Sequence, residues 1–161
     1  ELKTDKQRKL LLEEQKVFFE NINEPETVNA INDLLNENES FGFETTLASK
    51  TYRNKILKAK KLGYTVTLLF FWLNNIELAK ERVKTRVLEG GHHIPVGVIE
   101  RRYLRGINNL FDIYLDMVDA TFIFDNSYGK HELIAKKIEQ EDILISDDNK
   151  FNQLKAYYDK T

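Results

Sequence analysis

The chain has 161 residues, with 24 basic and 26 acidic side chains, a net charge of −2 and no cysteine. This length suits one domain with a full hydrophobic core, spanning residues 1–161. The slightly acidic balance argues against nucleic-acid or membrane-surface binding through bulk charge. The lack of cysteine excludes disulfides and cysteine-ligated metals, and it fits a reducing, cytoplasmic setting. No apolar run in the sequence approaches the roughly 18 residues of a membrane span, and no signal peptide is visible.

Periodicity and turn signals predict three helices and one strand in the first part of the chain. Val28, Ile31 and Leu35 fall on one helical stripe that opens at Pro25. Gly63 is a good residue to end a helix. The expected elements are helices over 2–20, over 25–35 and over 52–62, and a short aromatic strand over 40–46.

Residues 64–73 give the clearest strand signal, because they form a nearly continuous apolar run of the kind that a parallel strand covered on both faces has. Asn74 or Asn75 can cap the helix that follows. Later expected elements are a long helix carrying Ile99 through Met117, a strand over 121–125, a helix over 130–139, a strand over 142–146 and a helix over 149–158. This alternation predicts an α/β fold with a mostly parallel sheet sandwiched by helices.

Polar residues follow three of the expected strands. They are Glu44–Thr46, Asn74–Asn75 and Asp125–Asn126. Because α/β sheets bind ligands beyond the carboxyl ends of their strands, these segments mark the expected ligand edge. A chain also turns polar wherever a strand ends, and Asp125–Ser127 has a simple turn as its alternative.

Cations gather in one block around the Gly90–Gly91 pair. The block holds five of the seven arginines and two of the three histidines: Arg82, Arg86, His92, His93, Arg101, Arg102 and Arg105. Arginines at i, i+4 on two helices joined by a glycine hinge predict a lid that closes over phosphate groups. The alternative for Arg82 and Arg86 is a solvated helix flank paired with nearby glutamates, and for the histidine pair it is an exposed loop.

Glu44 is the strongest single candidate for a substrate-binding or catalytic residue. A carboxylate at the end of a buried strand can bind a hydroxyl group or act as a general base, and Thr45 and Thr46 add hydroxyl partners. The alternative is a carboxylate that caps the next helix or pairs with Arg53.

Several blocks, taken together and in order, resemble the zeta-toxin-like P-loop kinases of bacteria. They are SFGFETTL from Ser40, GYTVTLLFFWL from Gly63, the segment 81–105 with GGHHIP and ERRYLRG, Asn109–Leu110, and FDNS from Phe124. The resemblance covers about residues 26–128. It implies a P-loop NTPase-like fold and transfer of the γ-phosphate of ATP, with Mg²⁺, to a small acceptor.

In characterised members of that family the acceptor is a UDP-activated N-acetyl amino sugar, and an antitoxin protein restrains the enzyme. The resemblance implies that Glu44 and Thr46 contact the acceptor, that Arg82 contacts nucleotide phosphates, and that His92 lies near a second phosphate-binding cation. It gives no role to Arg86, Arg101, Arg102 or Arg105, for which the lid argument favours phosphate contact.

The phosphate loop of that family is the main departure, because no GxxxxGK[ST] motif occurs in these residues. Residues 1–24 match neither the family's first strand nor its catalytic aspartate. Without the loop, bound phosphates lose their backbone cradle and the first strand is missing from the sheet. We expect an upstream segment, a strand swapped from a second chain, or a rebuilt sheet. A catalytically degenerate domain that binds a nucleotide or a partner is the alternative, and the acidic pI argues against a nucleic-acid kinase.

Overall fold

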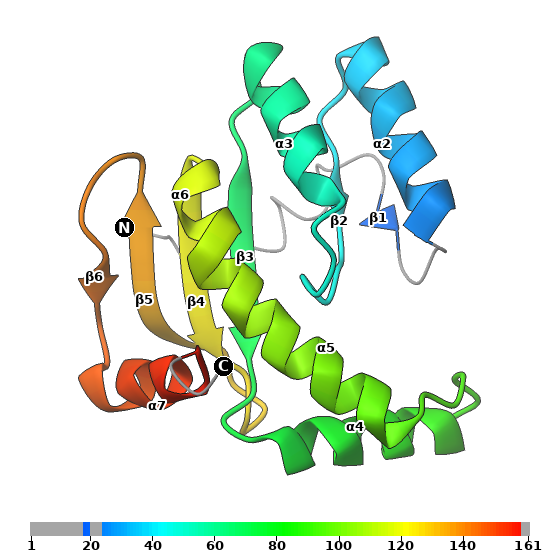
Figure 1. Cartoon of the computed structure of the whole chain (residues 1–161), viewed down its shortest axis with the longest axis vertical. Helices are drawn as coiled ribbons and strands as arrows, with labels where there is room; N and C mark the ends of the chain where they lie inside the picture. Colours follow the sequence, from blue (N-terminus) through cyan, green and yellow to red (C-terminus); the bar gives the residue numbers. More distant parts are fainter. Residues whose placement is uncertain (1–17, 20–23, 159–161) are drawn as a thin grey trace. The chain divides into compact units, whose positions relative to one another are not determined.

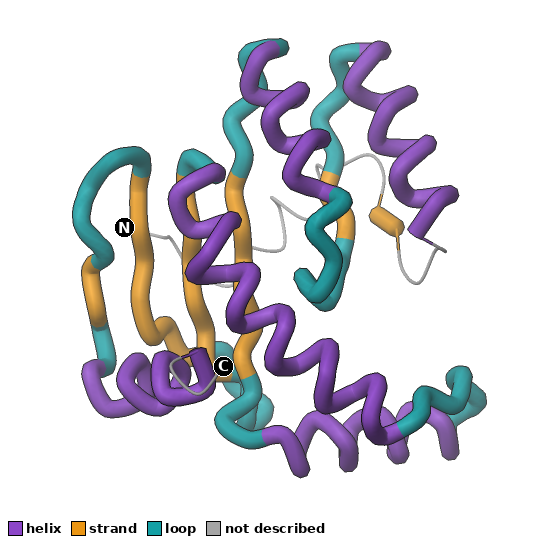
Figure 2. The backbone as a smooth tube through the Cα atoms, in the orientation of Figure 1, coloured by secondary structure: helices purple, strands orange, loops and turns teal. Residues whose placement is uncertain are grey.

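The structure is a computed structural model that describes residues 18–19 and 24–158, with side chains from Val28 onward. It divides the chain into two compact units, Glu1–Thr45 and Thr46–Thr161, which are described separately here. Figure 1 labels the helices and strands of both units, and Figure 2 shows the same backbone coloured by secondary structure.

The first unit contains one helix and a short parallel strand pair. Strand β1 (Phe18–Phe19) pairs with β2 (Gly42–Phe43). Helix α2 (Glu24–Glu37) buries Ile31 and Leu35, as the predicted stripe requires. The expected strand over 40–46 is therefore shorter than predicted. The helix expected over 2–20 lies mostly outside the described residues, and its last part is wrong, since residues 18–19 form a strand.

The second unit carries a four-stranded sheet in the order β3-β4-β5-β6. Its strands are β3 (Thr67–Trp72), β4 (Ala120–Asp125), β5 (Glu132–Ile138) and β6 (Leu144–Ile145). Strand β3 runs parallel to β4, whereas β4–β5 and β5–β6 are antiparallel. The molecule is thus α/β, but the prediction of a mostly parallel sheet is wrong.

Residues 130–139 cause this error, because they form β5 and not the predicted helix. A helix there would have served as the crossover that parallel strands need. Instead the short connection after Asp125 turns the chain straight back, and β5 pairs antiparallel with β4. Pairing buries Ile134 and Ala135 completely, so tertiary contact overrides the helix-forming residues of this segment.

The helices of the second unit match the sequence pattern more closely. They are α3 (Tyr52–Lys61), α4 (Ile76–Leu88), α5 (Val96–Asn109), α6 (Leu115–Met117) and α7 (Asp148–Tyr158), with a π-helical turn, η1, over Leu110–Tyr114 between α5 and α6. Asn75 caps α4 by accepting a hydrogen bond from the Leu78 amide (2.8 Å), and Gly63 follows α3 with φ +86°. Both capping predictions are confirmed.

The end of helix α5 passes in front of β3, the continuing η1–α6 segment lies in front of β4, and the start of α5 extends beyond the sheet beside α4 (Figure 1). The indole of Trp72 donates to the Tyr103 hydroxyl on α5 (3.0 Å), which fixes the side of β3 that faces this helix. The core between them is fully buried and contains Trp72, Ile107, Leu110, Tyr114, Ile123 and Ile134. Burial of this size supplies most of the stabilisation of such a layer, so the carboxyl ends of β3 and β4 rest on a rigid base.

Candidate functional site

The carboxyl ends of β3 and β4 are joined by hydrogen bonds between the segments that follow them. The Asn126 amide donates to the Trp72 carbonyl (2.8 Å), and the Asn74 amide donates to the Ser127 hydroxyl (2.9 Å). These two strand ends therefore meet at one edge of the sheet, as the sequence predicted. The polar residues there have fixed positions, which a binding site needs.

Asp125 is the buried charge of this edge, with only 2% of its surface exposed. It accepts hydrogen bonds from the amide (2.9 Å) and the hydroxyl of Ser127, and Lys150 lies 2.9 Å from its other oxygen. Burial alone raises the pKa of this carboxyl, but the bonds from Ser127 and Lys150 outweigh burial and hold the pKa below its usual value. With its bonds directed inward, Asp125 is a structural anchor for the turn.

Arg82 brings a cation to the same edge. Its Nη2 atom donates to the carbonyl of Asn126, directly after β4, at 2.5 Å. One backbone carbonyl engages only part of a guanidinium, which has five N–H donors in a planar fork. The remaining donors are available to a phosphate or carboxylate held at the ends of β3 and β4.

The Gly90–Gly91 pair ends helix α4 in a Schellman motif. The Gly91 amide donates to the Arg86 carbonyl (2.9 Å) and the Gly90 amide to the Val87 carbonyl (3.1 Å), with φ +97° at Gly90. A Cβ on Gly91 would lie 2.8 Å from the Arg86 carbonyl oxygen. Both glycines are thus required by the helix end itself, and the role of this turn as a lid hinge stays a prediction.

An ion-pair cluster joins α4 to α5 beyond this turn. The Lys80 ammonium lies 2.7 Å from Glu100 on α5 and 2.6 Å from Glu77 on its own helix. Both glutamates raise the pKa of Lys80 through their hydrogen bonds to it, and Glu100 has the larger effect. The two helices are therefore linked by charge near the middle of α4.

The other predicted phosphate ligands are all exposed. They are Arg86, His92, Arg101, Arg102 and Arg105, with His93 in the same turn. Among the described residues, no hydrogen bond or ion pair links any of them to Asn74, Asn126 or Ser127. The structure thus brings Arg82 to the ligand edge and leaves the rest as predictions.

The acceptor-side candidates fall on both sides of the unit boundary. Glu44 and Thr45 belong to the first unit and Thr46 to the second, and all three are exposed. Their roles in acceptor binding, and that of Glu44 in catalysis, stay predictions.

Three residues of α5 and η1 hold the loop after Thr46, and the sequence analysis missed this role. The Asn109 amide nitrogen donates to the Leu47 carbonyl and the Tyr114 hydroxyl to the Ser49 carbonyl, both at 2.8 Å. Gly106 lets the Thr46 carbonyl approach so closely that a Cβ would lie 2.6 Å from it. The signal in the sequence was a glycine within a helix, which often marks close backbone approach.

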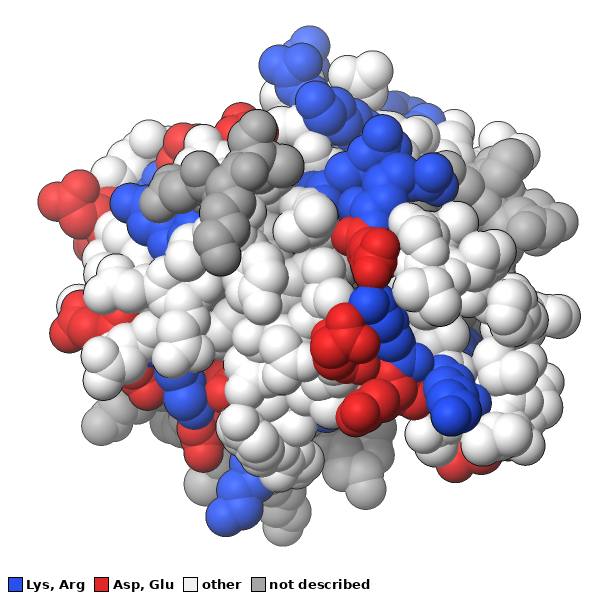
Figure 3. All heavy atoms as spheres, turned by 60° about the horizontal axis from the view of Figure 1, so that its bottom comes forward, with Lys and Arg blue, Asp and Glu red and all other residues white. Residues whose placement is uncertain are grey.

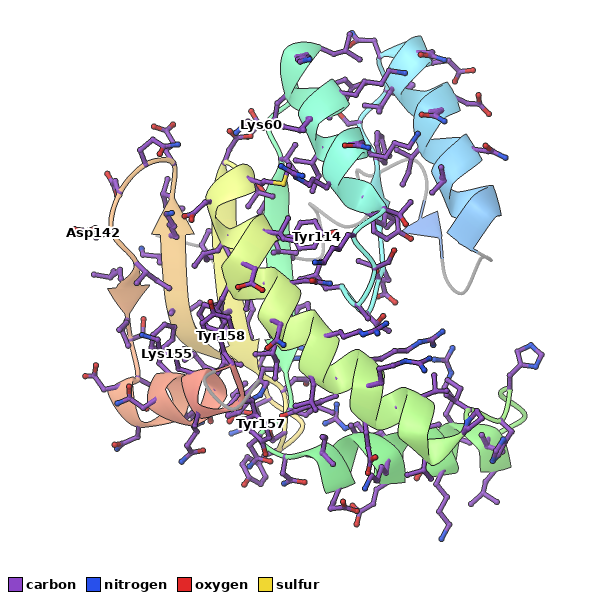
Figure 4. All side chains as sticks on the ribbon, viewed as in Figure 1. Lys60, Tyr114, Asp142, Lys155, Tyr157 and Tyr158 are labelled. Atoms are coloured by element: carbon purple, nitrogen blue, oxygen red, sulfur yellow. The ribbon has the colours of Figure 1, made fainter. Side chains whose placement is uncertain are left out.

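Two tyrosines complete the hydrogen bonding around the end of β3. The Tyr103 hydroxyl donates to the Leu73 carbonyl (2.6 Å), and burial is the main cause that raises its pKa. The Tyr157 hydroxyl lies 3.4 Å from the Asn74 carbonyl, and its ring meets that of Tyr103 edge to face at 5.2 Å. Figure 4 shows Tyr157 on α7, the helix below the strands. Neither residue was predicted to support this edge.

The described residues contain no cluster of three or more His, Cys, Asp or Glu side chains that could hold a metal ion. Within the same part of the chain, none of the helices has the length and apolarity to cross a bilayer.

Comparison with known proteins gives little further guidance. An uncharacterized protein of Haemophilus influenzae is 33% identical over 63 residues, which cover 39% of this chain and 45% of that protein. The match therefore spans less than half of that relative. No family model matches the chain, and no solved structure matches it significantly.

Proposed function

We propose that this chain is a nucleotide-binding domain of a zeta-toxin-like, P-loop NTPase-like, ATP-dependent phosphotransferase that acts on a small-molecule hydroxyl in the cytoplasm. The observation that carries the proposal is the Arg82 guanidinium at the carboxyl end of β4, beside the end of the parallel strand β3. An arginine at this edge suits a phosphate group, because it combines charge with a forked set of donors. In this proposal the arginines of α4 and α5 add charge to the bound phosphates.

The residues fit the phosphate part of ATP better than its metal. Arg82 supplies donors at the edge, whereas the described residues offer no metal cluster. Mg²⁺, when bound, would neutralise phosphate charge, but no step is assigned to it here. On the acceptor side, the resemblance implies that Glu44 and Thr46 contact the acceptor. The position of Glu44 after a strand suits a carboxylate that binds the hydroxyl or accepts its proton, and Thr45 adds a further hydroxyl partner.

A binding-only domain is the second candidate. The sequence favours it in one respect, since these 161 residues contain no phosphate-loop motif. Arg82 and its neighbours would then hold a nucleotide or sugar nucleotide without transfer.

The test is thermal denaturation of the full chain with ATP, ADP and a UDP-amino sugar, alongside a phosphate-transfer assay. A ligand that binds only the folded protein increases the free energy of unfolding, by about 2.7 kcal/mol when its concentration is 100 times its Kd. The melting temperature rises as a result. Arg82→Ala should remove this shift. The matched control is Arg53→Ala on α3, an exposed arginine outside the predicted site.

The outcomes separate the two candidates. A shift with phosphate transfer supports the phosphotransferase, and a shift without transfer supports the binding-only domain. If none of the ligands shifts the melting temperature, or if Arg82→Ala shifts as the native chain does, both are wrong.

A further inference from the structure

Helix α4 is incompletely covered by the rest of its unit. None of its 13 residues is buried, although it carries Ile76, Leu78, Val83 and Val87. A helix of this length has little stability of its own and depends on packing of its apolar side. The half-buried apolar side chains of α4 therefore lack part of the cover that such a helix has in a completed fold.

A groove of about 320 Å³ runs between α4 and the start of α5. Its walls are mainly apolar and include Val83, Val87, Ile94 and Ile99. Beside them Leu88 is 80% exposed and Val96 54% exposed. Leu88 and Val96 thus add exposed apolar surface to the edge of the groove. A two-fold interface uses the same surface on both copies, so each copy would supply both the groove and these side chains.

One pair of charges along the groove, Glu81 and Lys84, is complementary to the same pair on a second copy. Helix α4 lines it with the repeating order Glu77, Lys80, Glu81, Lys84, ahead of Leu88. When two copies of such a helix lie antiparallel across a two-fold axis near residues 82–83, Glu81 of each copy faces Lys84 of the other. In the described part of the chain, neither the Glu81 nor the Lys84 side chain forms an ion pair, so both charges are available. Figure 3, turned so that the side bearing α4 in Figure 1 comes forward, shows acidic and basic groups intermixed there.

We propose that the α4 groove is a homodimer interface, in which α4 helices of two copies pack antiparallel, with Leu88 of each copy lying at the Glu77 end of the groove of the other. The self-complementary charge order favours a second copy over an unrelated partner, because an unrelated surface would need the same alternation by chance. This interface involves no exchange of strands, and it does not depend on the proposed nucleotide site.

The test measures the association of the full chain by analytical ultracentrifugation over a range of concentrations. The native chain should sediment in a monomer–dimer equilibrium. Leu88→Glu should weaken dimerisation by at least tenfold, because it removes an apolar contact and places a carboxylate against Glu77 of the other copy, twice in each dimer. Leu57→Glu is the matched control, since Leu57 is a helical leucine that is 43% exposed on α3, and it should leave association unchanged.

Charge reversal tests the pairing itself. Glu81→Lys alone and Lys84→Glu alone should each weaken the dimer about tenfold or more, since like charges then face each other twice. An equimolar mixture of these two variants should dimerise, because all facing charges become opposite. The double variant carrying both reversals should dimerise as the native chain does.

The proposal is overturned by a native chain that stays monomeric at every accessible concentration, or by a dimer that Leu88→Glu leaves intact. It is equally overturned if the mixture associates no better than the single variants, since Glu81 and Lys84 would then not be in contact. Thermal unfolding of each variant, monitored by circular dichroism, establishes that lost association does not reflect lost folding.

Discussion

Two glycines of the same helix should respond in opposite ways to the same substitution. At Gly97, near the start of α5, an added Cβ meets nothing within 4 Å. Gly97→Ala should therefore stabilise the second unit by about 0.5 kcal/mol, because alanine restricts the unfolded chain and favours the helix. At Gly106, nine residues later in the same helix, the added Cβ would lie 2.6 Å from the Thr46 carbonyl oxygen.

The size of the Gly106 effect follows from two opposing contributions. Helix propensity favours alanine by about 1 kcal/mol. Forcing a methyl group against a backbone carbonyl costs about 1–3 kcal/mol as overpacking, and moving the Thr46 loop weakens the 2.8 Å bonds from Asn109 and Tyr114. We expect Gly106→Ala to destabilise the unit by about 2 kcal/mol, so that the two variants differ by about 2–3 kcal/mol.

Urea unfolding followed by tryptophan fluorescence measures this difference. The chain has a single tryptophan, Trp72, which is 1% exposed in the core of the second unit, so its emission reports that unit. The midpoint should move down for Gly106→Ala and up for Gly97→Ala, with an unchanged slope. Equal midpoints for the two variants would refute the argument that the Thr46 carbonyl requires a glycine at position 106.

Three further substitutions test the hydrogen bonds and charges of the second unit by the same unfolding assay. Lys150→Met should destabilise the unit by about 2–3 kcal/mol, because it leaves the Asp125 carboxylate buried without its cation. The control Lys155→Met, on the same helix, should change stability by less than about 0.5 kcal/mol. Equal effects of the two substitutions would contradict a role for the buried pair. Thr121→Val should raise stability by about 1 kcal/mol, since the buried Thr121 hydroxyl has no hydrogen-bond partner among the described residues, and a loss of stability would show that this hydroxyl is bonded. The hydrogen bond from the Val66 amide, and to a lesser extent that from Lys60, holds the pKa of Asp119 below its usual value. The ionised Asp119 carboxylate therefore stabilises the fold fully above the unfolded pKa of about 3.9, and this stabilisation is lost as the pH falls through the folded pKa. Asp119→Asn should flatten this acid decline, and an unchanged profile would contradict it.

The sequence predicted the elements whose local signals agree with their tertiary setting. Strand β3 combines a long apolar run with β-branched and aromatic residues, and α4 has both a capping asparagine and an apolar stripe. In each case propensity and pattern favour one structure. Burial does not follow: Leu69 and Phe71 are each 46% exposed, so the prediction that β3 is covered on both faces is wrong, and no residue of α4 is buried. The meeting of the β3 and β4 ends followed from topology alone, since neighbouring parallel strands end at one edge.

Contacts distant in sequence were beyond prediction for a physical reason. The segment HELIAKKIEQ is rich in helix formers, and only its pairing with β4 makes it a strand. Asn109 and Leu47 are 62 residues apart, and nothing local marks Asn109 as the donor that holds the Leu47 loop. The arginine block was visible as charge, but which arginine reaches the strand ends depends on the direction of α4.

Helix α4 permits the two proposals to be tested independently, because their residues lie on different sides of it. At about 100° per residue, Arg82 and Arg86 lie roughly 150° around the helix axis from the stripe formed by Glu77, Glu81, Lys84 and Leu88. Charge reversal at Glu81 or Lys84 should therefore change dimerisation and leave any nucleotide-induced thermal shift intact, whereas Arg82→Ala should do the opposite. Measuring both properties for both variants decides this: if either substitution abolishes both, the phosphate site and the interface are not separate surfaces, and α4 would act as one element coupling ligand binding to association.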